Sequence, residues 1–126
     1  MNEVIQSLQS MREVYAEFPK RLDGAQEELK KVDSEIQDIL HVIELTNFDA
    51  CKGYKWAKEL QKLRKERRRL KDEIESLEPI KELLSYQKPS EKNINKILGD
   101  VRKIETRHKN RGYSMRVRHD LQELMR

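Results

Sequence analysis

The stretch TNFDACKG, residues 46–53, interrupts a strongly helical sequence with residues that favour turns. Thr46, Asn47 and Asp49 are each suited to cap the start of a helix that follows. There are few other places where the chain can turn, because its 126 residues include only three prolines and four glycines. We therefore predict that the chain reverses direction near residues 46–52, between two long helices.

Apolar residues on both sides of this turn recur at alternating spacings of three and four, which is the a/d seam of a heptad repeat. The first seam contains Met1, Val4, Leu8, Met11, Tyr15, Phe18, Leu22, Ala25, Leu29, Val32, Ile36, Ile39 and Ile43. The second contains Trp56, Leu60, Leu63, Arg67, Leu70, Ile74 and Leu77. When the seams are paired antiparallel, facing residues such as Leu29 and Leu70 have numbers that sum to 99. The sequence thus predicts an all-α fold, based on a long antiparallel helical hairpin that resembles a coiled coil.

We assign the hairpin to residues 1–78 and a small C-terminal helical region to residues 79–126, packed on the hairpin or on a second subunit. Pro19 is expected to kink the first arm near residues 19–24, and two nearly collinear helices are favoured over one rod. Pro79 is expected either to end the second arm or only to bend it.

The C-terminal region is expected to contain one further helix, capped by Ser90 after a loop at residues 86–92 and stopped near Gly112. Residues 113–118 fit both strand alternation and helical spacing. A short final helix that starts from a Ser114 cap is favoured, because the acidic and amide residues that follow are poor strand formers.

Charge is divided unevenly between the two arms. Residues 1–50 carry 5 basic and 11 acidic side chains, whereas residues 51–126 have a net charge of +10. This asymmetry favours arms that lie against each other.

Arg67 occupies a seam position opposite Val32, where its stem can cover the valine and its guanidinium can reach Glu28 or Glu35. Alternatively, Arg67 pairs with another subunit or binds an anion.

The first arm is longer than the second, so residues 1–20 have no partner in this register. Either the C-terminal region folds back on their apolar seam or a second chain covers it, since exposed seams of this length usually indicate self-association. We therefore predict a homo-oligomer.

Composition excludes several classes of protein. With 36% hydrophobic and 40% charged residues, the chain is suited to long solvent-exposed helices. Its single cysteine, Cys51, cannot form an internal disulfide, and no apolar run is long enough for a signal core or a membrane span. These features predict a cytoplasmic protein with no membrane association.

Metal-ligand spacings, Gly-rich loops and nucleophile motifs are missing from the sequence, which predicts a non-enzymatic protein with no metal or cofactor.

Two groups of residues are candidates for binding. Basic side chains combined with a stacking ring could hold an anion or a nucleotide, and they are Arg67, Arg111, Tyr113, Arg116 and Arg118. Aromatic residues gather at the turn and form either a plug that closes the hairpin or a surface for a partner, and they are Phe48, Tyr54 and Trp56.

The order of ILHVIEL, GYKWAKELQ and RKERRRLKDEIESL, over about residues 30–80, resembles small helical proteins encoded by phages of Gram-positive bacteria. The segment YSMRVRHDL near the C-terminus has the same character. Such proteins often act against host immunity, and the paired long helices are similar to those of the Thoeris anti-defence family, oligomers that sequester cyclic-nucleotide signals. The resemblance implies a class of role, because no ligand-binding motif of that family matches here residue by residue.

These observations together favour a non-enzymatic, phage-type binding protein in the cytoplasm of a bacterial host. It would counteract a host defence component by binding a protein or by sequestering an anionic nucleotide. Two alternatives remain: a nucleic-acid-binding accessory protein that uses the basic C-terminal helices, and a structural coiled-coil adaptor.

Overall fold

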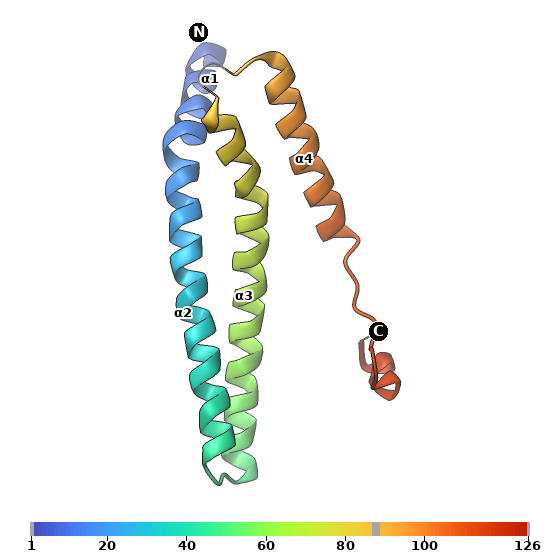
Figure 1. The fold of residues 1–126 in the computed structure, drawn as a ribbon. Coiled ribbons are helices and arrows are strands. Elements are labelled where there is room, and N and C mark those ends of the chain that lie inside the picture. The colour runs from blue at the N-terminus through green and yellow to red at the C-terminus, as the bar shows by residue number, and fades with distance from the viewer. Residues whose placement is uncertain (1, 87–88, 126) are drawn as a thin grey trace.

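The computed structural model describes residues 2–86 and 89–125, most of which are helical (Figure 1). The elements in chain order are α1 (Asn2–Arg12), the π-helical turn η1 (Glu13–Glu17), α2 (Phe18–Leu45), α3 (Ala50–Ser85), α4 (Glu91–Lys109) and the 3-10 helix η2 (His119–Met125). No strand occurs within residues 2–86 and 89–125, and the predicted all-α fold is confirmed. Met1, assigned to the first seam, and residues 87 and 88, assigned to a loop, lie outside the described residues.

Helices α2 and α3 run side by side in opposite directions and form the predicted antiparallel hairpin (Figure 1). Their shared core is made of seam residues, because burying the apolar stripe of each helix removes it from water. The centre of this core is a buried cluster of Ala25, Val32, Ile36 and Leu70, against which Leu29, Leu60, Leu63 and Ile74 pack. Leu22 and Leu77 are buried in the same hairpin, nearer its open end. Leu29 and Leu70 therefore belong to one core, as the antiparallel register requires.

The turn between the two arms is closed by side-chain caps. Asp49 is the N-cap of α3, where its Oδ1 accepts a hydrogen bond of 2.8 Å from the backbone N–H of Lys52. Thr46 lies on the other side of the turn and donates from its hydroxyl to the carbonyl of Val42. Of the three candidate caps in this stretch, Asp49 is the residue that starts the second arm.

The first arm follows a helical path from Asn2 to Leu45, and its irregularity lies at Glu13–Glu17 rather than at the predicted residues 19–24. In this π turn the N–H of Phe18 donates to the carbonyl of Glu13. Pro19 has no N–H to donate, and the wider turn before it relieves the clash between its ring and the preceding carbonyl groups. The expected separation into two helices is thus realised as a π turn between α1 and α2.

Pro79 lies inside α3, which continues to Ser85. Of the two predicted outcomes for this proline, the structure shows that the helix passes through it. The assigned boundary between residues 78 and 79 therefore lies within a single helix.

Helix α4 starts from the predicted cap, since Ser90 accepts a hydrogen bond of 3.2 Å from the N–H of Asn93. It then runs back along α3, and Ile97 is buried between the two helices. Figure 1 shows α4 on the side of α3 that faces away from α2. The C-terminal region thus packs on the hairpin of its own chain.

The end of the chain departs from the predicted helix. Residues after Lys109 are irregular as far as Arg118, so Ser114 caps no helix, and only the short 3-10 helix η2 follows. The Gln122 side chain closes this segment on itself: its Oε1 accepts from the N–H of Met115 and its Nε2 donates to the carbonyl of Tyr113. Val117 and Leu124 remain exposed, so the segment buries too little apolar surface to favour a regular helix.

None of the described helices has the length and apolar character needed to cross a membrane.

Candidate interaction surface

Exposed apolar side chains gather at the end of the molecule where α1 projects and α4 begins. We call this the end surface, and it consists of Val4, Ile5, Leu8, Met11, Tyr15, Ile94 and Leu98. The five members from α1 and η1 are between 49% and 60% exposed. Side chains of this size are rarely left together in water on a monomeric protein, and a contiguous group of them marks an interaction site.

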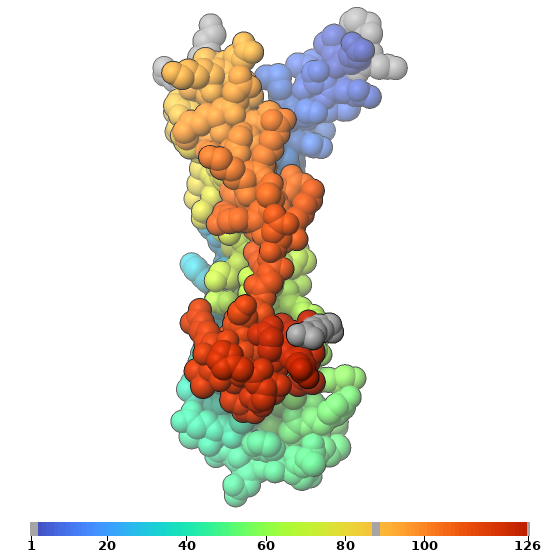
Figure 2. All heavy atoms as spheres, turned by 90° about the vertical axis from the view of Figure 1, so that its right-hand side faces the viewer, coloured from blue at the N-terminus to red at the C-terminus, as the bar shows by residue number. Residues whose placement is uncertain are grey.

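The end surface exists because the two arms differ in length. Helix α3 ends at Ser85, and in the register of the hairpin this leaves the seam of α1 with no helix opposite it. Figure 2 shows the start of α4 and the N-terminal helix as two separate projections at the same end of the molecule. The sequence predicted that residues 1–20 lack a partner within the hairpin, and the structure leaves the apolar row of α1 exposed.

An apolar groove lies at the base of the end surface. It has a volume of about 320 Å³ and is lined by residues of α1, η1, α3, α4 and the segment before α4. These residues are Ser10, Met11, Val14, Tyr15, Leu83, Pro89 and Ile94. The π turn shapes its floor, because it turns Val14 partly inward and leaves Tyr15 exposed. The groove therefore offers apolar contacts and few polar groups to a bound molecule.

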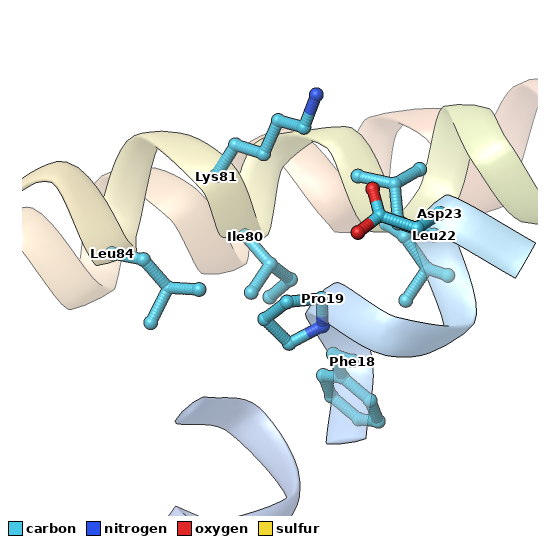
Figure 3. A pocket seen from close by; sticks show the side chains of 8 residues that line it. Phe18, Pro19, Leu22, Asp23, Ile80, Lys81 and Leu84 are labelled. Carbon is cyan, nitrogen blue, oxygen red and sulfur yellow. The ribbon is translucent and has the colours of Figure 1, made fainter. Parts of the chain in front are cut away.

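A second hollow, of about 60 Å³, lies between α2 and α3 beside Pro19 (Figure 3). Figure 3 shows the rings of Phe18 and Pro19 on one side, with Ile80 and Leu84 on the other. This space is small compared with the 300 Å³ or more of a typical ligand site. We interpret it as a packing defect of the seam next to the proline.

The basic residues proposed for an anion site are engaged within the chain. Arg67 Nε donates to Asp33 Oδ1 at 2.7 Å, Arg111 makes two bonds of 2.9 Å to the carboxylate of Asp72, and Arg118 pairs with Asp120. Arg67 points toward α2, whereas Asp72 and Arg111 belong to the contact between α3 and the end of α4. An anion would have to compete with a carboxylate at each of these arginines.

The expected partners of Arg67, Glu28 and Glu35, are incorrect, and the structure corrects them to Asp33. Asp33 directly follows Val32, which is the residue opposite Arg67 in the seam, so a guanidinium that leaves the seam sideways meets it first. Glu28 instead lies 3.9 Å from Arg69. The snorkelling interpretation itself agrees with the structure, because the side chain of Arg67 is 34% exposed.

Tyr113 and Arg116, the other members of the predicted anion site, are exposed in the irregular segment after α4. The backbone carbonyl of Tyr113 accepts a hydrogen bond from the side chain of Gln122, while the ring of Tyr113 is exposed to solvent. A nucleotide site made of these five residues stays a prediction.

Ion pairs fasten α4 and the residues just after it to α3. Lys96 Nζ lies 2.6 Å from Glu82, Arg107 lies 2.6 Å from Glu75, and Arg111 pairs with Asp72. The hydrogen bonds from Arg111 hold the pKa of the Asp72 carboxyl below its usual value, with smaller contributions from the charges of His108 and Arg68. This network holds α4 on α3, and with it Ile94, which lines the groove together with Met11 and Tyr15.

The aromatic residues at the hairpin tip divide into two roles. Phe48 and Trp56 pack edge to face with ring centroids 5.1 Å apart, and Phe48 remains 44% exposed. Tyr54 is exposed on the outside of α3, and Lys58 Nζ lies 5.4 Å from the centre of its ring. Partner binding by these three residues stays a prediction.

The described residues contain no group of three or more His, Cys, Asp or Glu side chains placed to hold a metal ion. No family model, no curated protein and no solved structure matches this chain.

The residues of the end surface were not among the predicted site residues. The signal that identifies them is present in the sequence, because the register of the two seams leaves residues 1–20 without a partner. The contribution of Ile94 and Leu98 could be seen only once α4 was placed against α3.

Proposed function

We propose that this protein is a non-enzymatic helical binding protein that acts by holding a protein partner on its end surface. The observation that carries the proposal is the exposed apolar row of Val4, Leu8, Met11 and Tyr15 beside the groove at Leu83 and Ile94. Apolar side chains in such an arrangement recognise an amphipathic helix through i, i+3, i+4 and i+7 contacts. They offer little to a nucleotide, whose phosphates require unengaged donors.

The sequence resemblance supplies the biological context of the proposal. A small phage-encoded helical protein in a bacterial cytoplasm would use this surface to occupy a component of the host's defence machinery. Nucleotide sequestration has less support, because Arg67, Arg111 and Arg118 already donate hydrogen bonds to carboxylates of the same chain. Nucleic-acid binding through α4 has less support for the same reason, since Arg107 and Arg111 are held by α3.

Photo-crosslinking tests the proposal directly. A benzophenone amino acid is incorporated in place of Leu8 in one variant and in place of Gln9, which faces away from the seam, in the control. Each purified variant is irradiated alone and in the lysate of a Gram-positive bacterium. We expect protein adducts from the Leu8 position in at least one setting and several-fold fewer from the Gln9 position. Equal labelling at the two positions, or no adduct at Leu8, would contradict the proposal.

Calorimetry provides the complementary measurement. Titration of the intact protein with a cyclic dinucleotide is expected to produce no binding heat, because Arg67, Arg111 and Arg118 are paired with carboxylates. Saturable heat that disappears in an Arg111→Ala, Arg116→Ala variant would restore the nucleotide-sequestering function in place of the one proposed.

A further inference from the structure

In the sequence, the apolar row of α1 continues the seam that α2 already buries, and the π turn η1 between them leaves Tyr15 exposed and turns Val14 partly inward. Upstream of η1 the apolar residues keep the alternating spacing of the heptad, through Val4, Leu8, Met11 and Tyr15. Downstream of η1, the same row packs against an antiparallel helix, α3. The natural occupant of the exposed part is therefore another antiparallel helix, which takes over where α3 ends at Ser85.

Helix α1 of a second copy fulfils this requirement. When two α1 helices are placed antiparallel with residue numbers that sum to 19, Leu8 faces the partner subunit's Met11 and Val4 faces the partner subunit's Tyr15. The register is self-complementary, since the same two pairs recur on the other side of a twofold axis. All four layers then place one apolar side chain against another.

Charge and shape favour the antiparallel over the parallel arrangement. Within Asn2–Arg12 the charged side chains are Glu3 and Arg12, and the antiparallel register places Arg12 near the partner subunit's Ser7, so like charges do not meet. Opposed helix dipoles attract. Antiparallel pairing also puts the α3 and α4 helices of the two copies at opposite ends of the contact, whereas parallel pairing would bring both sets to the same end.

The groove can accommodate the first turns of α1 from the second copy. In this register the partner subunit's Val4 lies level with Tyr15, at the apolar groove of about 320 Å³ that Leu83, Pro89 and Ile94 line from the other side. The start of α4 thus becomes part of the interface, which accounts for the exposure of Ile94. The interface combines the α1 pair with two copies of the groove.

We propose that two copies of this protein associate end to end through antiparallel α1 helices, with the first turns of each α1 seated in the groove of the other. This inference depends on the proposed function, because it names the second copy as the protein that the end surface binds. It also predicts a shape. The helical path from α1 to α2 is about 66 Å long, and two paths overlapped in this register span about 105 Å.

Disulfide trapping tests the register, in chains that carry Cys51→Ser to remove the native thiol. One chain carries Leu8→Cys and the other Met11→Cys. Under mild oxidation we expect the mixture of the two chains to form several-fold more linked dimer than either chain alone, because facing seam positions satisfy disulfide geometry. Efficient linking within each chain alone, with no increase in the mixture, would indicate parallel helices and overturn the arrangement.

Solution mass and small-angle X-ray scattering test the association itself. The intact protein is expected to have twice the 15.1 kDa mass of one chain and a maximum dimension near the longer of the two lengths. A variant with Leu8→Glu and Met11→Glu is expected to be monomeric at the same concentration, whereas a Gln9→Glu control stays dimeric. Circular dichroism confirms that all three are helical. A dimer that survives in the double variant would place the interface elsewhere and overturn the inference.

The crosslinking experiment separates this inference from the proposed function. A chain of 15.1 kDa in solution, with Leu8 adducts only to a lysate protein, would overturn self-association and leave the proposed function standing. Adducts between two copies, together with the double mass and with no adduct to a lysate protein, would support self-association through the end surface and would overturn the use of this surface against a host component. Absence of any Leu8 adduct together with a monomeric mass would overturn both.

Discussion

Arg67 on α3 and Asp33 on α2 are joined across the hairpin by a hydrogen-bonded ion pair of 2.7 Å between Nε and Oδ1. This contact explains how the seam tolerates an arginine. The stem lies over the apolar row and the guanidinium leaves sideways to a carboxylate that is itself 46% exposed. The charge is therefore neither buried nor left alone, and the hairpin keeps its register through this layer.

Replacement of this arginine by an apolar residue should not weaken the hairpin. Partly exposed ion pairs contribute about 0–1 kcal/mol, and well-packed apolar substitutes are often neutral or stabilising. We expect Arg67→Met to change the free energy of unfolding by less than about 1 kcal/mol, in the stabilising direction, as measured by urea denaturation. Arg67→Ala is the matched control and should destabilise, because it removes the covering stem. A loss above about 2 kcal/mol in the methionine variant would show that the ion pair is essential to the register.

Leu70 should be among the most sensitive positions of the core. It is 1% exposed and belongs to the central cluster with Val32 and Ile36. We expect Leu70→Ala to lower the free energy of unfolding by about 2–5 kcal/mol, the usual range for a buried leucine. The control is Leu40→Ala on the outer side of α2, where 43% exposure predicts a loss below about 1 kcal/mol. Similar losses at the two positions would contradict the assigned core.

Attachment of α4 to α3 should weaken in acid. The Arg111 guanidinium lowers the pKa of the Asp72 carboxyl in the folded protein, so the ionised form stabilises the fold above the usual carboxyl pKa of about 4. This contribution is lost as the pH falls through the lowered value. We expect hydrogen exchange of the α4 amides to accelerate relative to those of α2 below about pH 4.

Asp72→Asn provides the control for this pH dependence. The variant should exchange faster in α4 already at neutral pH, and its acid-induced change should be smaller because the titrating group is gone. Lys96 and Glu82 remain paired near the other end of α4 and should keep the first turns protected. A pH profile of α4 that is identical in the variant and the parent protein would show that Asp72 does not control the attachment.

Gly53 and Phe48 should be energetically coupled. A Cβ atom at Gly53 would lie 3.1 and 3.2 Å from two ring carbons of Phe48, which packs on Trp56. Alanine stabilises a helix relative to glycine by about 1 kcal/mol. Once the Phe48 ring is removed, the Gly53→Ala substitution should contribute this stabilisation without a close contact. We expect Gly53→Ala to stabilise a Phe48→Ala background more than it stabilises the parent protein, by up to about 1 kcal/mol in a double-mutant cycle of thermal unfolding. Equal effects in both backgrounds would mean that the ring moves aside at no cost.

Much of the architecture was readable from local patterns. The heptad spacing and the TNFDACKG turn predicted the hairpin and its register, because a periodic apolar row can be buried only against a row of the same period. Asp49 and Ser90 likewise act as caps within one turn of chain, where sequence neighbours are also spatial neighbours. The unmatched length of the first arm was also visible, and it is the origin of the end surface.

Other features depended on contacts between segments far apart in the sequence. The pairing of Arg67 with Asp33 and the ion pairs that hold α4, and with it Ile94, on α3 follow from side-chain reach and packing in three dimensions. The final segment has alternating and helical patterns at once, and its exposed Val117 and Leu124 bury too little to select an α-helix. The sequence alone therefore determined the hairpin, since a long repeat specifies its own pairing. The tertiary structure decided which apolar residues remain for a partner, because that depends on where α3 stops and α4 returns.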